Sequence, residues 1–219
     1  MAEFLFCPSL NAESGTFNLT PVADTYTRQD LPSSNFGTEN GLWVKKASTT
    51  ASANGDRNLY LRFAAASLTN TSSWIEQASL VLDATNRPGN GTTYFSFDLY
   101  GLPDGHPDEG FLETVLTFSN AYNSSTNQPG SFVTNSLVYL GSSKAVSTNV
   151  PQAMVWNSPA LREFIRGNRN TNLSFLLVRS SAHSDATSFA SRENTDPSLR
   201  PILTYTDSGD PYTPASVTD

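Results

Sequence analysis

Strict alternation of apolar and polar residues is the feature of this chain that most limits its fold. Residues 94–100 place Phe95, Phe97 and Leu99 on one side of an extended chain, and residues 78–83 repeat the pattern. Successive side chains of a strand point to opposite faces, so each segment predicts a half-buried strand. The same reasoning predicts strands at 23–27, 42–46, 58–63, 136–140, 173–179, 189–192 and 202–205. Many short strands between turn-rich stretches favour an all-β sandwich of two antiparallel sheets.

One helix is clearly marked between these strands. Ser158 is a suitable N-cap, Pro159 fits the first turn and Gly167 can end the helix. Three apolar residues recur at helical spacing: Leu161, Phe164 and Ile165. This single apolar stripe predicts a short crossover helix packed against a sheet edge or one end of the core.

Composition excludes several functional classes. The 219 residues include 13 Lys and Arg against 20 Asp and Glu, a net charge of -7 that argues against nucleic acid or an anionic membrane as a partner. The sequence has no long apolar run and no secretory leader pattern, so we expect a soluble protein that is either mature or recombinant. Cys7 is the only cysteine, which excludes an intrachain disulfide and a cysteine-based zinc site.

The domain organisation follows from the placement of these patterns. We expect one domain over residues 20–206, because no linker interrupts it. Residues 1–19 are expected to be an expression-derived start and a lead-in, and residues 207–219 a polar tail. The charged fraction of 15% and the many Asn, Ser and Thr residues indicate a secreted, extracellular protein.

Two of the predicted strands carry aromatic and cationic residues at alternate positions. Trp43 and Lys45 share one face of their strand, Tyr60 and Arg62 share one face of theirs, and Lys46 lies beside the first pair. Aromatic rings can stack on the apolar faces of sugars, and Arg or Lys can bind sugar carboxylates. The pattern predicts one open, sugar-binding surface; alternatively, the rings belong to the core and the cations only solubilise a sheet.

Other candidates are less clearly oriented. Tyr100, and with it Tyr94, lies on the outward row of its strand and is a second stacking candidate. Arg179 ends a strand that is apolar on both sides, so alternation does not give its direction. Arg192 is either a binding residue or the partner of Glu193 in an ion pair that holds the last strands together.

Eight segments together point to a known family. They are ADTYT at 23–27, SNFGT at 34–38, LWVK at 42–45, LYLRF at 59–63, FLETVLTFSN at 111–120, NTNLSF at 170–175, FASRE at 189–193 and RPILTY at 200–205. In order and spacing this set, with the helix ending at Gly167, resembles the DNRLRE-type domains among carbohydrate-binding modules, whose characterised members bind alginate. Phe111 and Phe118 replace tryptophans common there, and residues 64–66 are alanines where an Asp-Leu pair is usual.

The resemblance implies a jelly-roll sandwich that binds an acidic polysaccharide, most simply alginate or a related uronate polymer, without catalysis. Such a module would hold an appended catalytic domain on its substrate. The resemblance requires no cofactor, but such modules often hold a structural calcium. Asp24 and Glu193, brought together by a jelly roll, are the ligands we expect for it.

Two other functional classes stay open. A jelly-roll lyase or a hydrolase would need a base such as His106 or His183, but both lie in turn-rich segments, and the strand motifs of alginate lyases are absent. A structural or adhesive cell-surface domain would use the same strands only as a scaffold. Binding without product formation would separate the module from both.

Overall fold

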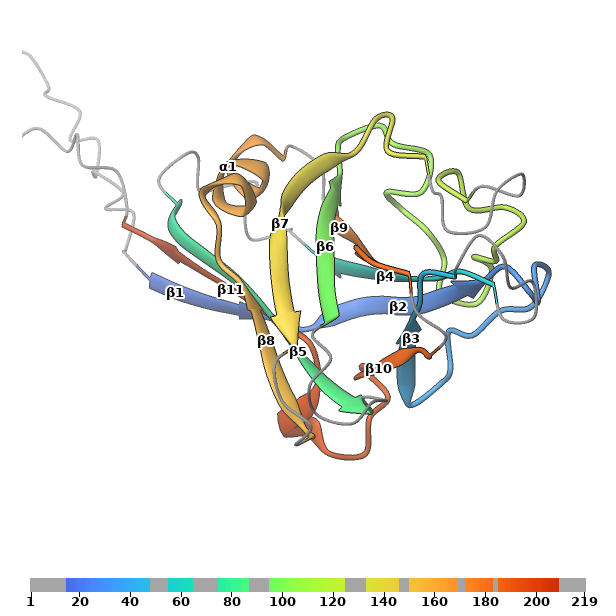
Figure 1. Cartoon of the computed structure of the whole chain (residues 1–219). Coiled ribbons are helices and arrows are strands. Elements are labelled where there is room, and N and C mark those ends of the chain that lie inside the picture. Colours follow the sequence, from blue (N-terminus) through green and yellow to red (C-terminus); the bar gives the residue numbers. More distant parts are fainter. Residues whose placement is uncertain are drawn as a thin grey trace, which may run out of the picture.

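The computed structural model describes residues 15–47, 55–64, 75–86, 95–124, 133–145, 150–168, 172–182 and 185–208. Within these residues it is a sandwich of two antiparallel sheets (Figure 1). The six-stranded sheet has the order β1-β11-β5-β10-β3, with β8 also paired to β5, and the five-stranded sheet has the order β2-β4-β9-β6-β7. No helix in the described part of the chain is long and apolar enough to span a bilayer.

Consecutive strands mostly alternate between the two sheets. Their bounds are β1 (Gly15–Leu19), β2 (Pro21–Arg28), β3 (Gly41–Val44), β4 (Arg57–Ala64), β5 (Ile75–Asn86), β6 (Phe95–Leu102), β7 (Val138–Ala145), β8 (Gln152–Trp156), β9 (Asn172–Arg179), β10 (Thr187–Ala190) and β11 (Ile202–Asp207). The predicted all-β sandwich is confirmed. Strands β1 and β8 were not predicted; β1 lies within the expected lead-in 1–19, where it pairs with β11 over its whole length.

The main core fills the space between the sheets. Phe97 of β6 meets Phe189 of β10 across the sandwich, with ring centroids 5.2 Å apart in an edge-to-face arrangement. Phe63 and Phe175 form a similar pair within the five-stranded sheet, 5.8 Å apart. All four rings are fully buried. Phe95, Phe97 and Leu99, which alternation placed on one side of their strand, all belong to this core.

The helix α1 (Pro159–Gly167) lies where the sequence predicted it. Ser158 caps it, because its Oγ accepts the backbone N–H of Leu161 at 3.1 Å. Leu161 and Ile165 are buried against the core, and Phe164 packs so closely on Gly101 of β6 that a Cβ there would lie 2.5 Å from its ring. This contact requires glycine at position 101.

A second, smaller core lies on the outer face of the five-stranded sheet. The segment that follows β6, described over 103–124, crosses this face and packs Phe111, Leu116 and Ala121 onto it. The residues beneath are Ala23, Tyr60, Leu102, Leu176 and Val178. The outer side chains of β4 and β9 are therefore buried there, together with Leu102 at the end of β6. Tyr100 of β6 is half-buried and packs against the edge of this cluster.

Candidate functional site

The two rows predicted to form one surface lie in different sheets. Strand β3 belongs to the six-stranded sheet and β4 to the five-stranded sheet. Both strands turn their aliphatic residues into the shared core, so Tyr60 and Arg62 project from the outer side of the five-stranded sheet. Trp43, on β3 of the other sheet, is half-buried and packs against the main core. The expectation of one common sugar-binding surface is wrong, because alternation gives the face of a strand but not its sheet.

The outer row of β4 is also covered. Tyr60 is fully buried, with its ring centroid 5.9 Å from that of Phe111 in the overlying segment. The guanidinium of Arg62 lies 5.8 Å from the same ring, and its Nη1 donates to Oδ1 of Asn172 at 3.3 Å. Tyr60 therefore stabilises the second core and cannot stack on a sugar at the surface of this structure.

The cation next to β3 is buried as well. Lys45 is 5% exposed, and its backbone pairs with that of Arg57 through two hydrogen bonds of 3.0 Å. Burial and the positive charge of Arg57 lower the pKa of Lys45. Trp43 is half-buried, with the Arg57 guanidinium 5.9 Å from its ring. Neither side chain offers the open contact that was predicted.

Arg179 points into the protein. It is 2% exposed, its guanidinium lies 3.7 Å from the centroid of the Phe95 ring, and its Nη1 donates to the carbonyl oxygen of Asp185 at 2.7 Å. A cation held over an aromatic face away from water is a stabilising contact. Arg179 therefore connects Asp185 to the first residue of β6 and is not available to a polymer.

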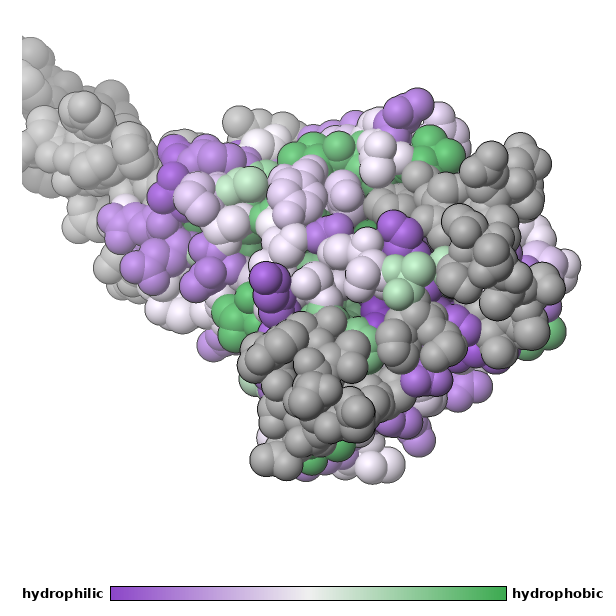
Figure 2. Space-filling model, viewed as in Figure 1, coloured by the Kyte–Doolittle hydropathy of each residue, from purple (hydrophilic) through white to green (hydrophobic). Residues whose placement is uncertain are grey.

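An open surface does exist on the outer side of β6 and β7. We call it the β6–β7 face and define it by six residues: Ser96, Asp98, Tyr100, Tyr139, Ser142 and Lys144. Strand β7 is an edge strand of its sheet and lies beside β6 in Figure 1. Figure 2, in the same view, shows mostly residues of intermediate hydropathy over β7.

A β-bulge determines which residues of β7 reach this face. Leu99 of β6 pairs with Gly141 and Tyr100 pairs with Tyr139, so Leu140 is the extra residue. Gly141 has φ of +132°, a conformation that side-chain-bearing residues rarely adopt. The bulge lets Leu140 enter the core while Tyr139 and Ser142, on either side of it, both face outward.

The two tyrosines form an aromatic platform. The rings of Tyr100 and Tyr139 lie 5.5 Å apart at 62°, and Tyr139 is 52% exposed. The hydroxyl of Tyr139 is 2.7 Å from Oγ of Ser142, which donates in turn to Oδ1 of Asp98. This chain of contacts holds the exposed ring in one orientation. Rigid, half-exposed rings of this kind suit contact with the flat face of a sugar.

One cation lies on this face, at its Ser96 end, and a second is linked to that end through backbone contacts. Lys144 is exposed and pairs across the strands with Ser96. Lys46, a predicted site residue, donates from Nζ to the carbonyl oxygen of Ser180 at 3.2 Å, and the backbone N–H of Ser180 donates to the carbonyl oxygen of Ser96 at 2.9 Å. The structure therefore places Tyr100, from the predicted set, beside Tyr139, and it links Lys46, also from that set, through Ser180 to the backbone of Ser96. The sequence analysis did not select Tyr139 or Lys144.

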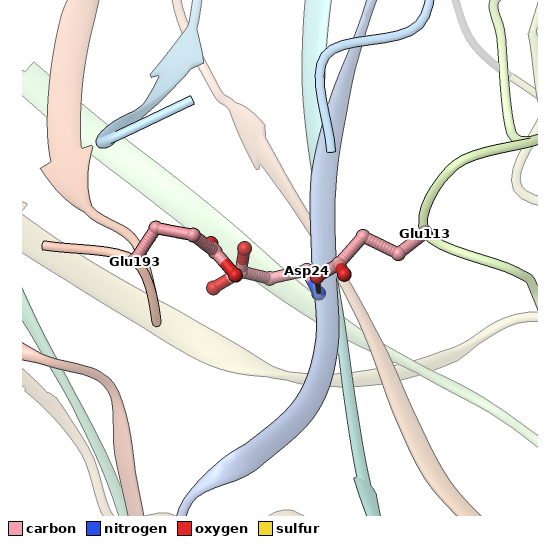
Figure 3. A group of neighbouring side chains, drawn as sticks. All are labelled: Asp24, Glu113 and Glu193. Carbon is pink, nitrogen blue, oxygen red and sulfur yellow. Dashed lines mark hydrogen bonds between the residues drawn. The ribbon is translucent and has the colours of Figure 1, made fainter. Parts of the chain in front are cut away.

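The predicted calcium ligands do meet, together with a third carboxylate. One ligand atom each of Asp24, Glu113 and Glu193 lies within 4.8 Å of the others. Figure 3 shows Asp24 and Glu193 facing each other on one side of β2, with Glu113 reaching the strand from the other side. Burial raises the pKa of Asp24 to about 8, against the backbone N–H of Arg192, and the two glutamates raise it further. Glu113 was not predicted as a ligand.

Arg192 ties this carboxylate cluster together. Its Nε lies 2.7 Å from Oε1 of Glu113 and 2.7 Å from Oε1 of Glu193, and its Nη2 donates to Oε2 of Glu113 at 3.1 Å. The ion pair between Arg192 and Glu193 that the sequence favoured is confirmed. Arg192 lies next to β2, which is the edge strand opposite β7 in the five-stranded sheet. It is therefore not part of the β6–β7 face.

Of the two histidines considered as a catalytic base, the structure describes His106, which is buried in the segment after β6. His106 is 6% exposed, its ring packs edge-on against Tyr122 at 5.3 Å, and its Nδ1 accepts the backbone N–H of Asp108. Burial lowers the pKa of His106, which favours its neutral form. His183 and Tyr94 lie outside the described residues.

The comparisons with known proteins add the family. None of the curated proteins matches the chain. One solved structure is titled "Structure of infectious bursal disease virus Gt strain"; its match covers 97% of this chain and 42% of the chain in that structure, at 10% identity. Its TM-score of 0.28 is too low to indicate a shared fold. The sequence model of carbohydrate-binding module family 96 matches residues 15–206, nearly the whole sandwich. The chain therefore belongs to carbohydrate-binding module family 96.

Proposed function

We propose that this module binds an acidic polysaccharide, alginate or a related uronate polymer, through the β6–β7 face and without catalysis. The observation that carries the proposal is the pair Tyr100 and Tyr139, in which the Tyr139 ring is held in place and is 52% exposed. The same side of the sheet is covered over β4 and β9. Family membership indicates that the ligand is a carbohydrate. The face supplies a place where a long polymer can lie without entering a closed pocket.

The tyrosine platform supports sugar binding on physical grounds. A pyranose ring has an apolar side that can cover an aromatic ring, and a ring already held in position loses little conformational freedom on binding. Tyr139 is held in this way by Ser142. Asp98 and Ser142 add hydrogen-bonding groups beside the rings, which suit the hydroxyls of a sugar.

The cations at the Ser96 end support an acidic polymer. A uronate chain carries one carboxylate per sugar, so a polymer lying along β6 and β7 would bring carboxylates to Lys144 and Lys46. Each exposed pair contributes at most about 1 kcal/mol, so the affinity of one module should be modest and should fall with salt. Such binding suits a secreted module that keeps an appended catalytic domain near its substrate.

Affinity electrophoresis tests the proposal. Native gels contain alginate, pectin, ulvan, neutral laminarin or no polysaccharide, and each soluble polymer is also assayed for new unsaturated or reducing ends. We expect retardation by the acidic polymers, clearly weaker retardation of Tyr139→Ala, and no new unsaturated or reducing ends. The matched control is Val155→Ala, which removes an exposed apolar side chain from β8 of the other sheet.

The outcomes separate the competing functions. Retardation by laminarin alone would contradict the acidic ligand, and new chain ends would show a lyase or hydrolase. Retardation that survives Tyr139→Ala but is lost in Trp43→Ala would move the site to the outer side of β3. No retardation by any polymer would favour a scaffold domain.

A further inference from the structure

A groove lies on the outer side of the six-stranded sheet, where α1 meets β5 and β11. Its volume is about 300 Å³, which is at the lower end of the range for small-ligand sites. Residues 76–79 of β5 and 204–206 of β11 form its floor, and residues 157–162 form its wall. The helix α1 lies next to β5 at this end of the sheet (Figure 1). The groove is therefore on the opposite sheet from the β6–β7 face.

The floor of the groove is a polar array fixed by strand register. Ala78 and Tyr205 pair across the strands and turn into the core, so their neighbours turn outward. These neighbours form two cross-strand pairs of polar residues: Ser79 with Thr204, and Gln77 with Thr206. Four hydrogen-bonding side chains are therefore held in a two-by-two arrangement on paired strands, and little of the floor needs to be ordered when a ligand binds.

The groove has hydrogen-bonding groups to spare. Within the part of the chain that the structure describes, no hydrogen bond joins the side chain of Gln77, Ser79 or Asn157 to another residue. Ser158 differs, because its Oγ caps α1 and donates to the carbonyl oxygen of Leu140. An amide offers donors and an acceptor, and a hydroxyl offers both, so these free groups can pair with the adjacent hydroxyls of a sugar.

The charged residues of the groove do not favour an acidic ligand. Nη1 of Arg162 donates to the carbonyl oxygen of Glu76 at 3.4 Å, and its Nη2 lies 3.0 Å from Oε1 of Glu163. The Glu76 side chain is itself exposed at the groove. One guanidinium thus stands against two carboxylates, so a sugar carboxylate would gain little here. An uncharged sugar would meet the amides and hydroxyls without this repulsion.

We propose that this groove binds an uncharged saccharide, which hydrogen-bonds to Gln77, Ser79 and Asn157 and rests on the exposed ring of Pro159. Membership of a carbohydrate-binding family supports a sugar as the ligand. The site is independent of the β6–β7 face, because it lies on the other sheet and takes a different class of sugar. One module could then hold an acidic and a neutral polymer on opposite sides.

Amide chemical shifts of the ¹⁵N-labelled protein test the groove with neutral probes: laminarihexaose, cellohexaose and mannohexaose. We expect at least one probe to give saturable shifts centred on residues 76–79, 157–162 and 204–206, including the side-chain amides of Gln77 and Asn157. The dissociation constant should be on the order of 1 mM, and added salt should not raise it, because no ion pair forms with the ligand. Alginate hexasaccharide should shift these residues clearly less.

Two amide variants and two controls make the test specific. Gln77→Ala and Asn157→Ala each remove one exposed amide, so the protein should still fold and the dissociation constant should rise about three- to tenfold. Asn86→Ala removes an exposed amide from the far end of β5 and should bind the neutral probe as the wild type does. Tyr139→Ala should also leave this binding unchanged, because Tyr139 lies on the other sheet.

Three results would overturn the proposal. The groove would not be a saccharide site if none of the neutral probes shifted its residues at about 10 mM, tenfold above the expected dissociation constant. Shifts of the same residues by alginate hexasaccharide, as large as those by a neutral probe, would overturn the uncharged class. Unchanged affinity in both amide variants would place the neutral sugar elsewhere. Alginate binding at the β6–β7 face is measured separately, so failure of the groove and failure of the proposed function remain distinguishable.

Discussion

Removal of the exposed aromatic ring at position 139 has a calculable effect on polysaccharide binding. Tyr139 is 52% exposed, and a fully covered tyrosine buries about 200 Å², so roughly 100 Å² is open. A sugar lying on one face of the ring covers about half of that, ~50 Å², which at ~25 cal/mol per Å² contributes about 1.3 kcal/mol. Tyr139→Ala should therefore raise the dissociation constant for alginate roughly tenfold.

The assay is the dependence of gel mobility on alginate concentration, repeated by calorimetry with alginate oligosaccharides. Tyr139→Phe keeps the ring and loses only the contact between the hydroxyl and Ser142, so it should retain most of the affinity. Val155→Ala should behave as the wild type. An unchanged dissociation constant in a folded Tyr139→Ala protein would refute the platform, since no other described residue places so exposed a ring on this face.

Four further changes test separate parts of the structure. Lys144→Ala should weaken alginate binding about two- to fivefold at low salt and leave any laminarin binding unchanged, measured on the same gels. Gly101→Ala should lower the free energy of unfolding by about 1 to 3 kcal/mol in denaturant titrations, because its Cβ would lie 2.5 Å from the Phe164 ring. Arg179→Ala should lower it by about 2 to 3 kcal/mol while the folded protein binds polysaccharide normally. Burial raises the pKa of Asp108 above its ordinary value of 3.8. The protonated carboxyl therefore stabilises the fold fully below pH 3.8, and this contribution is lost as the pH rises through the raised pKa of the folded protein. Asp108→Asn should be more stable than the wild type at pH 7, and the difference should shrink toward pH 4 in the same titrations.

Local sequence patterns account for much of the framework. Alternation predicted β6 and β9 within a residue or two, and the cap at Ser158 predicted the start of α1. These signals depend on near neighbours in the chain, which is why they survive in the fold. Strand β1 alternates, with Phe17 and Leu19 on one side, but it lies in the segment that was set aside as a lead-in. Strand β8 is apolar on both sides, Ala153 and Val155 against Met154 and Trp156, so alternation gives it no face.

The candidate site depended on information that alternation does not contain. Tyr60 and Arg62 do share a face, but the segment after β6 buries it. Phe111 and Leu116 were a weak indication of this covering segment, since they are apolar residues in a stretch with neither helical nor strand periodicity. Tyr139 fell inside a predicted strand but was not selected, because the bulge beside Gly141 decides its exposure together with that of Ser142. Gly141 was the available signal.

The carboxylate cluster likewise depends on the whole fold and not on local sequence. Asp24 and Glu193 were suggested by a family resemblance, not by their spacing, and Glu113 lies 89 residues from Asp24 in the chain. Their meeting requires the edge strand, the covering segment and the connection after β10 to converge, which is a property of the whole fold.

The most direct test of the β6–β7 face is a titration of the ¹⁵N-labelled protein with alginate oligosaccharides, followed by amide chemical shifts. We expect the largest changes within Phe95–Leu102 and Val138–Ala145, and we expect them to diminish as salt is added. Changes centred instead on Gly41–Val44 or Arg57–Ala64, with β6 and β7 unaffected, would contradict it.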